Sequence, residues 1–183
     1  MPRLVLVRHG RATGGWDDEP DPGLDELGQH QAQAIAARLA PGLPVALVSS
    51  PLRRCRETAA ALAEQWSAVV TIEACVAEIP SPEGVPLNDR VGWLREACAG
   101  TWASLGLRYE SYRDDIAAYL LSLTEDTVVF SHFIAINAAI GVAMGDDRIV
   151  IASLDNTSCT ILEHDGITMR LVEAGSEAET LFR

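Results

Sequence analysis

Short apolar runs recur along the chain and are separated by longer segments in which apolar and polar residues mix. The runs are rich in Val, Ile and Leu, which is typical of strands buried inside a sheet. We predict strands at residues 4–7, 45–48, 69–74, 127–130, 149–153, 157–163 and 168–172. The last two strands are joined by His164-Asp165-Gly166, a sequence that favours a hairpin.

The segments between these runs predict helices, because their apolar residues recur near helical spacing. The predicted helices cover residues 24–39, 50–66, 87–99, 109–123 and 133–144. Pro41-Gly42 ends the first helix. Ser49-Ser50-Pro51 begins the second, since a serine side chain caps free backbone N–H groups and proline is tolerated in the first turn.

The alternation of strands and helices predicts an α/β fold. We expect a three-layer α/β/α sandwich, in which a mainly parallel central sheet carries helices on both faces. The chain has no internal repeat, linker or low-complexity tract. Residues 1–183 are therefore predicted to form a single domain.

Charge narrows the range of partners. The formal net charge of −12 argues against binding to nucleic acid, which needs a basic surface, and against docking on anionic lipid. The basic residues are fourteen arginines and no lysine. Five of them fall in two short stretches, at positions 8, 11, 53, 54 and 56. This clustering is a first indication of a site for a small anion.

The number and spacing of the cysteines indicate the redox compartment of the protein. The chain has four, widely spaced, with no CxxC pair and no histidine at zinc-ligand spacing. We expect reduced thiols, a cytoplasmic protein, and neither a metal nor another cofactor. No signal peptide is expected, because Arg8 interrupts the first apolar run, and no stretch approaches the length needed to span a bilayer.

Polar residues follow three of the predicted strands at the point where each strand ends. They are Arg8-His9-Gly10, the stretch from Ser49 to Arg54, and Ser131-His132. The carboxyl ends of parallel strands form the functional edge of such a sheet. Guanidiniums suit phosphate oxygens, and the start of a helix at Ser50-Pro51 adds free N–H groups. An imidazole beside fixed cations stays neutral and is then a nucleophile towards phosphorus.

These segments resemble the histidine phosphatase superfamily, also called phosphoglycerate-mutase-like, in its short bacterial phosphatase branch. Five motifs carry the resemblance: "RHG" at 8–10, "LDELGQHQA" at 24–32, "SSPLRRCRET" at 49–58, "VAEI" at 76–79 and "VVFSH" at 128–132. The third fits the family pattern SSPLxRAxxT, which assigns the family arginine to Arg54 rather than Arg53. The fourth places the family acid at Glu78.

The resemblance implies a role for each matching residue. His9 attacks phosphorus and becomes a phosphohistidine, while Arg8, Arg54 and His132 hold the phosphoryl oxygens. Glu78 protonates the leaving oxygen and then activates the hydrolytic water, and His132 also counts among the catalytic residues. No metal is needed. Glu83 lies close enough in sequence to be an alternative acid.

Three positions depart from the family pattern or extend the site. Arg11 stands where relatives often carry an acidic residue, Phe133 follows the second histidine in place of glycine, and Asp25 replaces a threonine. Arg11, Thr13 and Phe133 are candidates to contact substrate. Ser50, Ser131 and Thr13 either bind phosphate or serve as caps and turns. Residues 80–112, with Trp93, Trp102 and Tyr109, form a candidate lid and specificity segment.

The sequence favours a metal-independent phosphomonoesterase acting on a small phosphorylated metabolite. The alternatives are a phosphoprotein phosphatase that removes phosphate from histidine, an inactive phosphate-binding module, and a phosphoglycerate mutase. An inactive module is disfavoured because every position that the mechanism needs is filled. A mutase is disfavoured because true mutases are longer, with additional segments over the site. Glu78 favours an ester substrate, because an alkoxide leaving group needs a proton.

Overall fold

The computed structural model describes residues 1–14, 19–86 and 89–176, and in these ranges six strands form one mixed sheet. The sheet order is β3-β2-β4-β1-β5-β6. The strands are β1 (Arg3–Arg8), β2 (Ala46–Ser49), β3 (Val70–Ile72), β4 (Thr127–Ser131), β5 (Cys159–His164) and β6 (Met169–Glu173). The first four are parallel, and β5 and β6 add an antiparallel hairpin beside β1. The predicted mainly parallel sheet is confirmed.

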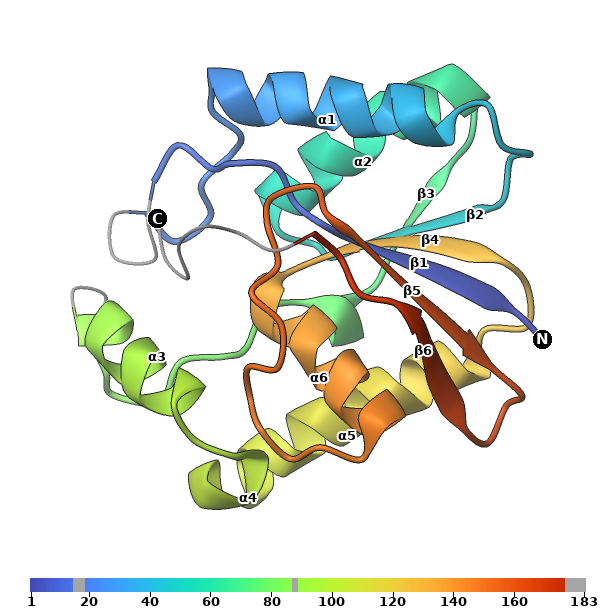
Figure 1. The fold of residues 1–183 in the computed structure, drawn as a ribbon. Coiled ribbons are helices and arrows are strands. Elements are labelled where there is room, and N and C mark those ends of the chain that lie inside the picture. The colour runs from blue at the N-terminus through green and yellow to red at the C-terminus, as the bar shows by residue number, and fades with distance from the viewer. Residues whose placement is uncertain (15–18, 87–88, 177–183) are drawn as a thin grey trace.

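Helices cover both faces of this sheet, which confirms the predicted three layers (Figure 1). Helices α1 (Glu26–Leu39) and α2 (Arg53–Trp66) pack on one face, and α5 (Leu107–Ser122) and α6 (Phe133–Met144) on the other. The short helices α3 (Arg90–Cys98) and α4 (Trp102–Leu105) lie near the end of the sheet where β4 runs into α6. A 3-10 turn, η1 (Ala74–Val76), follows β3.

Side chains on the central strands alternate between two apolar clusters. Leu4 and Leu6 of β1 pack with α5 and α6, whereas Val7 packs with α1 and α2. Successive side chains of a strand point to opposite faces. The next two residues should therefore separate, with Arg8 towards α6 and His9 towards α2.

One predicted strand is wrong. Residues 149–153 form no strand but an irregular segment, held by the buried side chain of Asn137 on α6. Its Oδ1 accepts from the N–H groups of Ile151 and Ala152 at 2.8 and 2.9 Å, and its Nδ2 donates to Ala152 O at 3.1 Å. One amide side chain thus provides the hydrogen bonds that a neighbouring strand would have supplied. An apolar run alone does not distinguish these two cases.

The second helix also begins later than predicted. Its first residue is Arg53, and Leu52 rather than a serine is the N-cap, without a side-chain hydrogen bond. The Ser50 hydroxyl accepts from Leu52 N at 3.3 Å and therefore closes a tight turn before the helix.

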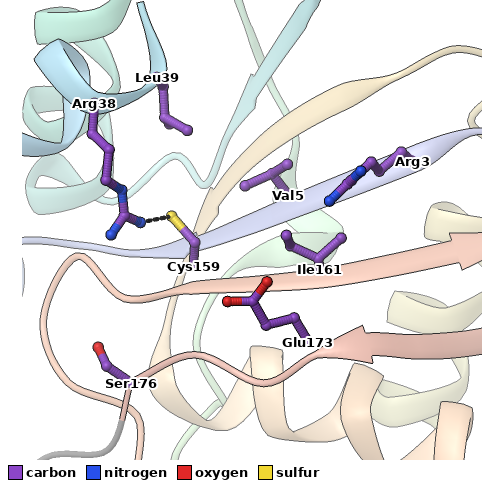
Figure 2. Close-up of a pocket in the computed structure, with 8 residues that line it drawn as sticks. All are labelled: Arg3, Val5, Arg38, Leu39, Cys159, Ile161, Glu173 and Ser176. Carbon is purple, nitrogen blue, oxygen red and sulfur yellow. Dashed lines mark hydrogen bonds between the residues drawn. The ribbon is translucent and has the colours of Figure 1, made fainter. Parts of the chain in front are cut away.

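A groove of about 440 Å³ lies between the end of α1 and strands β1, β5 and β6, lined among others by Arg3, Arg38 and Cys159 (Figure 2). Arg38 donates to Cys159 Sγ at 2.7 Å. All four cysteines are free thiols. None of the predicted site residues lines this groove.

Within the described ranges, no helix combines the length and the apolar character needed to cross a membrane.

We predict that Asn137→Ala destabilises the protein by about 2–4 kcal/mol, because the N–H groups of Ile151 and Ala152 lose their acceptor. Urea unfolding measures the change. Gln29→Ala, at an exposed position of α1, is the control and should change the free energy of unfolding by less than about 0.5 kcal/mol. A loss for Asn137→Ala no larger than the control's would contradict this account of the segment.

Candidate active site

The three polar segments meet at one edge of the sheet, as predicted. Beyond the regular ladder, His9 N donates to Ser131 O and Ser50 N donates to Phe130 O, each at 3.0 Å. These bonds continue the pairing of β1 and β2 with β4 past the strand ends. They set Ser50, His9 and His132 side by side.

Arg54, in the first turn of α2, links the two histidines. Its Nε donates to His9 Nε2 and its Nη2 lies against His132 Nδ1, both at 3.1 Å. The two imidazole rings lie edge to face, with centroids 5.2 Å apart. All three side chains are buried. Three of the four residues predicted to attack phosphorus and to bind its oxygens therefore form one cluster.

The contacts of Arg54 fix the protonation of both rings. A guanidinium has donors and no acceptor, so His9 Nε2 and His132 Nδ1 each present a lone pair. His9 Nδ1 carries the proton and donates to Gly10 O at 2.7 Å. Burial lowers the pKa of both histidines well below the ordinary range, and the charges of Arg54 and Arg8 lower it further. His9 is thus neutral, with its Nε2 lone pair beside a cation.

Close packing against α1 and α2 holds the loop that carries His9. Gly10 N donates to Thr58 Oγ1 of α2 at 3.0 Å. A Cβ added at Gly10 would lie 2.7 Å from the carbonyl oxygen of Gly28, and one added at Gly28 would lie 2.0 Å from Arg11 O. Both glycines, one from each of the first two motifs, are needed for the first turn of α1 to rest on the loop.

Arg8 lies on the α6 side, as the alternation along β1 requires. Its guanidinium lies over the Phe133 ring, 5.1 Å from the centroid, and its Nη1 donates to Leu154 O at 2.6 Å. Its Nε is buried with no hydrogen-bond partner. Burial lowers the pKa of Arg8 although Glu78 and Asp155 oppose the shift. Phe133 therefore supports Arg8, while its contact with a substrate stays a prediction.

Glu78 and Glu83 occupy very different surroundings. The Glu78 carboxylate accepts from Ile79 N at 3.0 Å and from Ile134 N, at the start of α6, at 3.3 Å. Burial raises the pKa of Glu78, although these hydrogen bonds and the charges of Arg54 and Arg8 oppose the shift. The Glu83 side chain is 95% exposed and lies 4.0 Å from Arg108. Only Glu78 is placed among the site residues.

Arg11 and Thr13 lie in the loop that follows His9. The Arg11 guanidinium pairs with Asp25 at 2.5 Å, and Arg11 N donates to Gln31 Oε1 at 2.8 Å. Asp25 in turn caps α1, accepting from Gly28 N at 2.7 Å. The side chain of Thr13 is exposed. Arg11 thus fastens the loop that carries His9 to α1, and a substrate contact by either residue stays a prediction.

The segment 80–112 forms α3, α4 and the start of α5, apart from residues 87–88, which lie outside the described ranges. Trp102 is fully buried in the core and packs on Tyr112, whose hydroxyl donates to Ala77 O at 2.8 Å. Trp93 packs on Tyr109. The segment thus reaches the backbone beside Glu78, and its role as a lid stays a prediction.

Sequence reasoning missed several supporting contacts. Asn156 Nδ2 donates to His9 O at 2.9 Å, and Cys55 Sγ lies 3.3 Å from His132 Nε2. Ser131, a candidate phosphate contact, instead donates to Val76 O at 2.7 Å. Asn156 lies in an irregular loop, and nothing in its sequence neighbourhood signals this contact. Among the residues that the structure describes, no group of three His, Cys, Asp or Glu side chains could hold a metal ion.

The sheet order, the covering helices and the buried cluster at the carboxyl ends of the parallel strands are of the phosphoglycerate-mutase-like type. The profile of the histidine phosphatase superfamily (branch 1) matches residues 4–176, and the chain belongs to this superfamily.

Named relatives include two glucosyl-3-phosphoglycerate phosphatases. The protein from Mycobacterium tuberculosis is 31% identical over 140 residues, which cover 69% of this chain and 60% of the relative. The protein from Mycolicibacterium vanbaalenii is 39% identical over 80 residues, which cover 42% of this chain and 36% of the relative. The matches thus span less than two thirds of the length of these relatives.

Solved structures share the fold across nearly the whole chain. A mycobacterial glucosyl-3-phosphoglycerate phosphatase in complex with VO3 has a TM-score of 0.73 and 27% identity, covering 93% of this chain and 97% of that one. A phosphoserine phosphatase from Entamoeba histolytica, in complex with 3-phosphoglyceric acid, has a TM-score of 0.75 and 22% identity, covering 100% of both chains.

The buried histidines predict a distinctive dependence of stability on pH. Because the folded pKa values of His9 and His132 are lowered, the unfolded chain binds protons below about pH 6.5 that the folded protein does not. The stability that the two neutral histidines contribute to the folded protein is complete above this pH and is lost as the pH falls. The free energy of unfolding should drop by up to about 1.4 kcal/mol per pH unit for each histidine.

Urea unfolding at pH 7, 6 and 5.5 checks this prediction. The double variant His9→Asn/His132→Asn should have a clearly shallower dependence, and His164, whose pKa burial also lowers, accounts for part of the remaining slope. His30→Asn, at an exposed position of α1, controls for the loss of an imidazole. Equal slopes in wild type and double variant would refute the neutral state of the two rings.

Proposed function

We propose that the protein is a metal-independent phosphomonoesterase that hydrolyses a small phosphorylated metabolite through a phosphohistidine at His9. The observation that carries the proposal is the state of His9, a buried neutral ring with its Nε2 lone pair beside the Arg54 guanidinium. A neutral imidazole is a nucleophile, and adjacent fixed cations hold the anion that it attacks.

In this proposal the phosphoryl oxygens are held by Arg8, Arg54 and His132. The unpartnered Nε of Arg8 supports this role, since a buried donor without an acceptor favours an anionic ligand. Arg54 contributes donors that rest on the two imidazoles in the free protein. When phosphate binds, these donors turn to its oxygens and leave the His9 lone pair free for attack.

The reaction proceeds in two displacements. His9 Nε2 forms a bond to phosphorus while the bond to the leaving oxygen breaks, and that oxygen keeps the electron pair and takes a proton from Glu78. Water then attacks the phosphohistidine, giving its proton to Glu78 as the N–P bond breaks and phosphate is released. The raised pKa of Glu78 supports its role as an acid near neutral pH.

The proposed substrate class is a small phosphate ester. The named relatives are glucosyl-3-phosphoglycerate phosphatases, and a structural neighbour is a phosphoserine phosphatase. Both named substrates are small phosphorylated metabolites. A partly buried acid that interacts electrostatically with Arg54 and Arg8 supports an ester, since an alkoxide needs a proton to leave whereas a phosphohistidine nitrogen needs it less. Free thiols and a net charge of −12 support a cytoplasmic enzyme that binds neither nucleic acid nor membranes.

We predict that the protein hydrolyses p-nitrophenyl phosphate in the presence of a chelator and that His9→Ala abolishes this activity. Brief incubation with labelled substrate should trap an acid-labile, base-stable phosphoenzyme in the wild type only. His30→Ala is the control that retains activity. Activity that survives His9→Ala would refute the mechanism. Loss of wild-type activity in the presence of chelator would indicate a metal phosphatase. A panel of phosphorylated metabolites, including glucosyl-3-phosphoglycerate, phosphoserine and 3-phosphoglycerate, then identifies the substrate.

A second prediction separates the two candidate acids. Glu78→Gln should lower kcat for an alkyl phosphate by roughly 10²- to 10⁴-fold, because the alkoxide leaves unprotonated. It should lower kcat for p-nitrophenyl phosphate far less, because nitrophenolate is stable without a proton. Glu83→Gln, which changes an exposed residue, should affect neither substrate. Equal losses on both substrates for Glu78→Gln would exclude Glu78 as the proton donor.

A further inference from the structure

The two nitrogens of His132 lie in different surroundings. Nδ1 faces Arg54 Nη2 at 3.1 Å, and since a guanidinium cannot accept a hydrogen bond, Nδ1 carries the lone pair. Nε2 lies 2.8 Å from Ser50 Oγ. The proton of the neutral ring is therefore on Nε2, which donates it to the serine hydroxyl.

Ser50 is held where it can only accept from this ring. It is fully buried at the end of β2, and its backbone N–H donates to Phe130 O. Its Oγ also accepts from Leu52 N at 3.3 Å. With His132 Nε2–H as the second donor, both lone pairs of the hydroxyl are used. The turn that delays the start of α2 thus positions an acceptor for the second histidine.

We propose that Ser50 is a positioning residue that assigns the two nitrogens of His132, holding Nε2–H so that Nδ1 is the nitrogen that takes a proton from the bound phosphate monoester. The inference rests on the proposed function, because it requires a phosphoryl group beside His132. Ser50 itself touches neither substrate nor phosphate in this arrangement.

The proton transfer is balanced. A monoanionic phosphate ester carries one P–OH group, whose O–H bond breaks as an N–H bond forms at Nδ1. The electron pair stays on the phosphate oxygen, which gives a dianionic phosphoryl group hydrogen-bonded to an imidazolium. Such a charge-assisted hydrogen bond is shorter and stronger than a neutral one.

The free protein keeps this proton off the ring. Groups facing His132 come from α2, which contributes Arg54 and Cys55, and from the end of β1, which contributes Arg8 and His9. Burial and the two arginines lower the pKa of His132. An incoming phosphate reverses the balance of charge at Nδ1. The imidazolium then needs an acceptor for Nε2–H at a fully buried position, and Ser50 is that acceptor.

Nitrogen NMR of the full-length protein labelled with ¹⁵N-histidine tests the assignment, with inorganic phosphate as the probe. We expect His132 to be neutral and protonated on Nε2 in the free protein, and to become an imidazolium when phosphate saturates the site. A proton on Nδ1 in the free protein, or a ring that stays neutral with phosphate bound, would overturn the inference. Failure of the wild type to bind phosphate would instead count against the proposed function.

Kinetics of three variants test the role of Ser50. Ser50→Ala should lower kcat/KM for an aryl phosphate roughly 10- to 100-fold, mostly through kcat, and Ser50→Thr should recover most of the loss because it keeps the hydroxyl. Ser122→Ala, which removes an exposed serine hydroxyl at the end of α5, is the control and should leave kcat/KM unchanged. Thermal melts confirm that each variant is folded. If the wild type is active and a folded Ser50→Ala has wild-type kinetics, the role of Ser50 is refuted while the proposed function stands.

Discussion

The site depends on one buried guanidinium that can only donate. Arg54 has both imidazoles as its hydrogen-bond partners, so each ring must present a lone pair to it. His9 is then protonated on Nδ1 and His132 on Nε2, and each remaining N–H finds an oxygen, Gly10 O in one case and Ser50 Oγ in the other. Arg54 thus faces a lone pair on each histidine, while Gly10 O and Ser50 Oγ hold the opposite ring N–H groups.

The fold supplies this geometry through strand alternation and close backbone packing. Because Arg8 and His9 follow a buried strand, they separate to opposite faces of the sheet, one over Phe133 and the other beside Arg54. Gly10 and Gly28 then allow α1 to rest directly on the loop.

Much of this arrangement is predictable from the sequence. His9 and His132 follow apolar runs directly, and the carboxyl ends of parallel strands meet, so their proximity follows from pattern alone. Contacts that depend on register between distant segments are not predictable in this way. Examples are Asn156 on His9 O, 147 residues away in sequence, and the Asn137 amide that replaces a strand partner at residues 149–153. The ion pair between Arg11 and Asp25 is another such contact, because it joins two segments fourteen residues apart.

The arginines show how an acidic protein prepares a site for an anion. Surface arginines pair with carboxylates, as Arg53 does with Glu57, Arg148 with Asp146 and Arg170 with Glu163. Within the described part of the chain, Arg8 and Arg54 have no carboxylate within 4.0 Å and contact neutral acceptors instead. Burying such charges without a counterion costs several kcal/mol. In the proposed function, phosphate is the counterion that offsets this cost. The net charge of −12 is therefore compatible with the proposed function, because Arg8 and Arg54 make the local charge at the proposed site positive.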